Sequence, residues 1–262
     1  MSKIPRLLIA LVSVFLSLGL SPTLFSQTSA ADSFDKPLKK IVMDLGPSPY
    51  SPGGKVRVKL SCYSYPTFVI KQYDEGEKGA EWIAIIPTTK GALPPCTRGA
   101  AAGERRIDGA EWSGYFKGAK DNLVFIDGAD GVDRGLPFVV YDSTTGVKLF
   151  EDSAYAVAMG NSKANELPAK ALRVSRAADG HLHLRYLRVV EAGCDLHLEK
   201  APCWERARNK FELKSTELPV CSGYAGISDR EVSAIAYPVE VVLLPKPSIH
   251  AVAGPTKCWP VD

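Results

Sequence analysis

The chain has 262 residues, of which 32 are lysine or arginine and 29 are aspartate or glutamate, so its formal net charge is only +3. A chain this close to neutral has no electrostatic signature of nucleic-acid binding or of attraction to anionic lipid. The length is sufficient to bury a core without help from metal ions.

The first 31 residues follow the pattern of a secretory signal peptide. Lys3 and Arg6 provide a positive start, residues 7–20 form an apolar run, and Ser29 and Ala31 occupy the small-residue positions of a cleavage site. The run of about 14 residues is shorter than the roughly 20 that a membrane-spanning helix needs. We therefore expect an exported protein, periplasmic or secreted, with no membrane anchor after signal cleavage.

All six cysteines follow this segment, and an even number in an exported chain favours disulfides. Six cysteines can form many different sets of disulfides, and the sequence alone does not decide among them. Near neighbours close the shortest loops, which favours Cys62–Cys96, Cys194–Cys203 and Cys221–Cys258. The sequence contains no C-x-x-C motif, so it suggests neither a thioredoxin-type site nor a zinc knuckle.

Residues 32–54 are rich in proline, glycine and serine, and we expect an extended lead-in with one edge strand at 40–44. Residues 55–262 form the predicted β-rich, disulfide-stapled domain. In its first half, apolar runs lie between turns rich in glycine, proline and aspartate. They predict strands at residues 55–65, 67–73, 81–86, 112–117, 123–126, 137–141 and 147–150.

The second half of the domain continues this pattern. A hairpin is predicted around Asp179-Gly180, a strong turn dipeptide, and the chain then returns through Leu196 and Leu198 in a further strand. Pro238 is expected to separate two late strands. One helix is predicted at 203–210, and the further strands are expected at 171–177, 181–190, 231–236 and 239–244.

Roughly ten to twelve strands and at most two short helices predict a mainly β single domain, built as a sandwich or an irregular barrel. Residues 139–150, VVYDSTTGVKLF, resemble the two strands and tight turn of blades in β-propellers of the pyrroloquinoline-quinone-like kind. The resemblance covers one blade and implies a small β-propeller as the alternative architecture.

Three aspartates in the turn after residue 126 are the first candidate site. Asp127, Asp130 and Asp133 are three residues apart and interleaved with glycines, and calcium prefers several oxygen ligands on such flexible turns. The spacing differs from that of an EF-hand, and no glutamate stands at the twelfth position. Turn chemistry alone explains every residue here, so we expect no cofactor, with calcium held by these aspartates as the alternative.

Three histidines are the second candidate site. His181 and His183 are two residues apart, so they share one face of a strand, and we expect His197 on the next strand. A His-x-His pair with a third histidine is a zinc-like ligand set. The competing interpretation is an exposed polar sheet face with a cross-strand ion pair between Arg185 and Glu199.

Seven aromatic residues are the third candidate. An exposed row of rings could stack on sugars, whereas packing in a core is the more common use of such residues. They are Tyr63, Tyr65, Trp82, Trp112, Tyr115, Phe116 and Trp204.

No motif in the sequence assigns a catalytic residue, since G-x-S-x-G, H-E-x-x-H, the P-loop and G-x-G-x-x-G are all absent. We therefore expect an exported β-rich binding or structural module rather than an enzyme. Its partner would be an extracytoplasmic protein or carbohydrate. The alternative is a secreted hydrolase that depends on a metal held by the aspartates or the histidines.

Overall fold

The computed structural model describes residues 34–51, 53–88, 93–131, 134–155, 171–225 and 232–261. Over these ranges the chain forms fourteen strands and two short helices, which confirms the mainly β class. The strands form two antiparallel sheets that do not close into a barrel and are consistent with a sandwich. The expected signal peptide lies outside these ranges.

The first five strands form the N-terminal sheet, in which each strand pairs with the next. Alternation of buried and exposed residues builds β2, where Val58 and Leu60 are buried and Lys59 is exposed. The sequence did not predict β5, since it has only four residues and buries Ile107 alone. The strands are β1 (Lys39–Pro47), β2 (Arg57–Ser64), β3 (Phe68–Asp74), β4 (Trp82–Pro87) and β5 (Arg105–Asp108).

The other nine strands form the second sheet, in the order β13-β12-β11-β9-β8-β7-β6, with β10 paired to β11 and β14 paired to β12. Its first part, β6–β9, is called the central meander, and β10–β14 are called the C-terminal strands. The meander comprises β6 (Gly114–Lys120), β7 (Leu123–Gly128), β8 (Leu136–Asp142) and β9 (Lys148–Ala154). The C-terminal strands are β10 (Arg173–Arg176), β11 (Leu182–Glu191), β12 (Val232–Val242), β13 (Ser248–Ala251) and β14 (Lys257–Val261).

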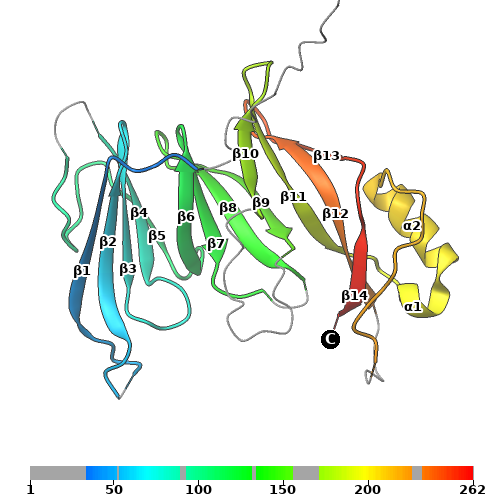
Figure 1. Ribbon diagram of the computed structural model, residues 1–262. Coiled ribbons are helices and arrows are strands. Elements are labelled where there is room, and N and C mark those ends of the chain that lie inside the picture. The colour runs from blue at the N-terminus through cyan, green and yellow to red at the C-terminus, as the bar shows by residue number, and fades with distance from the viewer. Residues whose placement is uncertain are drawn as a thin grey trace, which may run out of the picture.

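The central meander is buried on both faces. Val124 and Ile126 of β7 pack in one core with the N-terminal sheet. Leu123 and Phe125 point the other way and pack in a second core with the C-terminal strands, where Phe138 meets Tyr186 edge-on at 5.1 Å between ring centroids. The three layers follow one another across the view in Figure 1.

The second sheet bends between its two halves. β9 and β11 share a single strand pair, Ala154 with Arg188, followed by one hydrogen bond from the Tyr155 amide to the Leu187 carbonyl at 2.8 Å. So short a junction lets the C-terminal strands fold back over the meander. The hairpin of β8 and β9 matches the predicted one, and Gly146 has the positive φ of 69° that its turn requires.

Two helices lie beside β12 and β14 (Figure 1). Helix α2 (Ala201–Phe211) confirms the predicted helix and buries Cys203, Trp204 and Ala207 in the second core. Helix α1 (Leu196–Glu199) replaces the strand that we expected through Leu196 and Leu198.

Pro238 does not divide two strands, which corrects the prediction, because β12 runs through it from Val232 to Val242. On the side away from β11, β14 pairs with β12 up to Ala236 and β13 pairs from Val239 onward. Pro238 therefore lies between the segment of β12 that pairs with β14 and the segment that pairs with β13. A backbone N–H is not needed for pairing at this position, so proline is tolerated there.

The structure pairs Cys62 with Cys96, Cys194 with Cys203 and Cys221 with Cys258, which are the three pairs favoured from the sequence. The first bond holds the loop before β5 against the outer face of the N-terminal sheet. Lys71, only 1% exposed, adds a second tie there by donating to the Gly99 carbonyl at 3.0 Å and lying 3.7 Å from Glu104.

Replacing Cys62 and Cys96 together with alanine should lower the free energy of unfolding by about 3 kcal/mol, because the bond closes a loop spanning 34 positions. Urea unfolding of the variant and of the wild-type protein measures the difference. A loss below about 0.5 kcal/mol would show that Lys71 and Glu104 hold the loop without the disulfide.

Candidate ligand-binding groove

The structure places two of the three candidate calcium ligands in separate ion pairs. Asp127 is buried at the end of β7 with an oxygen 3.1 Å from Lys117 Nζ, and Asp130 pairs with Lys78 on the surface. Asp133 lies outside the described residues. Over the described part of the chain, no three histidine, cysteine or acidic side chains gather in a way that could hold a metal ion.

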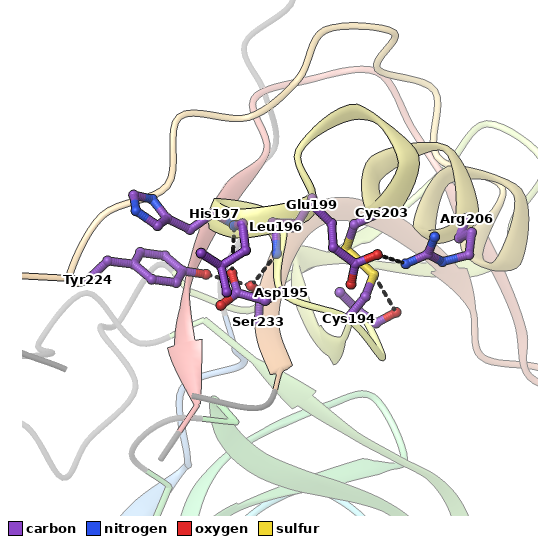
Figure 2. Close-up of a disulfide and its surroundings, with 11 residues drawn as sticks. Cys194, Asp195, Leu196, His197, Glu199, Cys203, Arg206, Tyr224 and Ser233 are labelled. Carbon is purple, nitrogen blue, oxygen red and sulfur yellow. Dashed lines mark hydrogen bonds and ion pairs between the residues drawn. A yellow bond between two sulfur atoms is a disulfide. The ribbon is translucent and has the colours of Figure 1, made fainter. Parts of the chain in front are cut away.

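The three candidate histidines are not brought together. His183 lies between Glu240, which contacts its Nδ1, and Asp179, whose oxygen is 3.2 Å from its Nε2. His181 is exposed just before β11. His197 is on α1, where its ring stacks on Tyr224 at 4.7 Å (Figure 2).

The placement of His197 on a strand was wrong because Asp195 starts a helix. Its Oδ1 accepts hydrogen bonds from the backbone N–H groups of His197 and Leu198, at 2.7 and 3.1 Å. The disulfide of Cys194 and Cys203 then closes the turn around α1 (Figure 2). An N-capping aspartate inside a short disulfide loop was the signal in the sequence for this helix.

The predicted ion pair of Arg185 with Glu199 is also wrong. Glu199 pairs with Arg206 of α2 instead. Arg185 pairs with Glu240, which lies directly opposite it on β12.

The seven candidate aromatic residues contribute to the cores rather than to one exposed row. Tyr65 and Trp204 are buried, and Trp82 stacks on Tyr73 at 5.4 Å on the outer face of the N-terminal sheet. The remaining four pack at the edge of the core between the N-terminal sheet and the meander, namely Tyr63, Trp112, Tyr115 and Phe116.

A groove of about 520 Å³ lies on the outer face of the C-terminal strands. Leu187 of β11 and Pro238 of β12 are opposite each other and line it. Leu187 alternates with Tyr186, whose side chain belongs to the second core, so the Leu187 side chain points away from that core. The volume is within the range of small-molecule sites.

An aromatic ring forms one wall of this groove. Tyr155 follows β9 and is held by its backbone hydrogen bond to Leu187. Its ring packs against Trp259 of β14 at 5.3 Å, and Lys257 Nζ lies 4.4 Å from the ring centroid. These contacts fix the ring and bring the Lys257 ammonium group to the groove.

The groove also contains two arginines that face each other. Arg173 of β10 lies directly opposite Arg185 of β11, and both line the groove. Like charges directly opposite on neighbouring strands are destabilising. Glu240 pairs with Arg185, with an oxygen 3.1 Å from Nε and 3.0 Å from Nη2. Among the described residues, no carboxylate forms an ion pair with Arg173 or Lys257.

His183 shares Glu240 with Arg185. The hydrogen bond that protonated His183 donates to Glu240 raises the pKa of His183, partial burial opposes the increase, and Asp179 adds to it. Burial also raises the pKa of Glu240, but the hydrogen bonds from His183 and Arg185 outweigh this effect and lower it overall. The trio fixes the position of Arg185 at the groove.

Protonated His183 should stabilise the fold in acid. Because its pKa is higher in the folded than in the unfolded state, this contribution is complete below about pH 6 and is lost as the pH rises through the folded-state pKa. His183→Gln should therefore cost more stability at about pH 5 than at about pH 9.

Urea unfolding at both pH values measures this difference. The exposed His181→Gln variant is the control and should keep the wild-type pH dependence. An equal cost of His183→Gln at both pH values would contradict the assignment.

No helix within the described ranges is long and apolar enough to span a membrane. No protein-family model matches the chain, and neither a curated protein nor a solved structure shows significant similarity to it.

Proposed function

We propose that this protein is an exported binding module that holds an anionic ligand with an apolar body in the groove on its C-terminal strands. The three disulfides support the exported part of this proposal, because such bonds persist in oxidising compartments.

The observation that carries the binding proposal is the pair Arg173 and Arg185. The fold places two arginines opposite each other on β10 and β11, and the carboxylate beside them, Glu240 on β12, lies on the far side of Arg185 and pairs with Arg185 rather than with Arg173. A ligand carboxylate or sulfonate at Arg173 would remove this repulsion and would accept bidentate hydrogen bonds from a planar guanidinium. Lys257 adds a further positive charge at the same groove.

The apolar part of the ligand follows from the walls. Leu187, Pro238, Tyr155 and Val252 line the groove with hydrocarbon or ring surface. A ring or short chain could bury its surface there while its acidic group stays at the arginines. The groove therefore favours an amphipathic anion over a fully polar one.

Calorimetric titration of the purified protein with naphthalene sulfonate, and with the neutral naphthalene methanol, tests the proposal. We expect the sulfonate to bind and the alcohol to bind at least about tenfold more weakly, since a charge-assisted hydrogen bond is worth about 1.5–3 kcal/mol. Arg173→Gln should weaken sulfonate binding by a similar factor.

The same variant gives a second readout. Because Arg173→Gln relieves a like-charge contact, it should raise the stability of the ligand-free protein by a few tenths of a kcal/mol. Arg206→Gln on α2 is the matched control and should leave sulfonate affinity unchanged. Equal binding of sulfonate and alcohol, or an unaffected Arg173→Gln variant, would contradict the proposal.

A further inference from the structure

The outermost strand of the N-terminal sheet exposes apolar residues. Among the described residues β1 pairs with β2 alone, and its residues are exposed except for two of intermediate burial. Val42 is 52% exposed, and Met43 and Leu45 beside it are exposed as well. Six of the eleven large exposed hydrophobic residues in the described ranges lie between 38 and 56, and three of these six are on β1.

An edge strand also leaves backbone hydrogen-bonding groups unpaired. Alternate residues of β1 direct their N–H and C=O groups away from β2, which makes the edge a template for another strand. Two prolines, which cannot donate, bracket this template at Pro37 and Pro47. A shift in register between Asp44 and Gly46 also ends the regular part of β1 before Pro47. Val42 is the midpoint between the two prolines.

The residues around Val42 are complementary to themselves. If two copies of β1 run antiparallel with Val42 opposite Val42, then Lys40 is opposite Asp44 of the second copy and Ile41 is opposite Met43. A two-residue slip in either direction would place Val42 opposite Lys40 or Asp44 and would remove the Lys40–Asp44 pair. A one-residue slip would turn each side chain to the wrong face of the sheet. Opposite charges and apolar pairs across strands are stabilising.

Both charged residues are already held on the edge. Lys40 Nζ lies 5.1 Å from the Tyr63 ring centroid, and Asp44 accepts hydrogen bonds from Arg57 at 2.9 and 3.0 Å. The Asp44 side chain remains 54% exposed, so its oxygens can accept from a further donor. Because both side chains are already ordered by these contacts, they lose less conformational entropy when Lys40 and Asp44 form an ion pair across the edge.

We propose that two copies of this chain associate through β1, antiparallel and with the two-fold axis at Val42, so that their N-terminal sheets join into one continuous sheet. The contact is isologous, as in most homodimers, and closes after two copies. It covers Val42, Met43 and Ile41 and gives hydrogen-bond partners to the backbone N–H and C=O groups at the edge of β1. The groove lies on the C-terminal strands, so the dimer does not depend on ligand binding.

Sedimentation equilibrium of the purified full chain tests the association. We expect a dimer at micromolar concentration, and Val42→Lys should make the protein monomeric, because it places two like charges at the axis. Val147→Lys, at an equally exposed position in the turn after β8, is the control and should remain dimeric. A monomeric wild-type protein, or a Val42→Lys variant as dimeric as the wild type, would overturn the proposal.

Cysteine cross-linking tests the register. Val42→Cys should form a disulfide-linked dimer on treatment with diamide, because two residues at the axis lie within disulfide distance. Met43→Cys faces Ile41 across the axis and should cross-link far less. Equal cross-linking of the two variants, or efficient cross-linking only by Met43→Cys, would overturn the register.

Discussion

The structure depends on a sheet segment that is buried on both faces. All six residues of β7 are buried, and successive side chains of β7 and β8 enter two different cores. A strand that is buried on both faces has a continuous apolar sequence. Each of its two apolar faces must therefore be covered by another layer of the structure. The N-terminal sheet covers one face and the C-terminal strands fold back over the other through the short junction of β9 with β11. The layered architecture follows from this constraint.

The layering determines where ligands and partners can bind. Because the inner faces of both outer layers are used for the cores, only their outer faces and edges remain available. The loop that Cys96 and Lys71 secure lies against part of the outer face of the N-terminal sheet. The remaining surfaces include the groove beside Arg173 and the edge of β1, which lie on different sheets. A binding site and a self-association surface can therefore coexist without competing.

The sequence predicted individual strands and turns better than it predicted how these elements pair and pack in three dimensions. Alternation in β2 and the turn at Asp179-Gly180 are local signals, and both were read correctly. The alternation Leu196-His197-Leu198 was read as a strand because the capping role of Asp195 depends on a helix that follows it. The groove could not be predicted, since Tyr155, Arg173 and Lys257 meet only through strand pairings that no local pattern specifies. The self-complementary residues of β1 were visible in the sequence, but their exposure was not.

The proposed function requires that a ligand binds in the groove. The most direct measurement follows the backbone amide signals of the isotopically labelled protein by nuclear magnetic resonance during titration with naphthalene sulfonate. We expect saturable shifts concentrated at residues 171–173, 185–187 and 252–257, which line or adjoin the groove. Shifts that are absent, that do not saturate, or that concentrate on α2 or on the N-terminal sheet would contradict it.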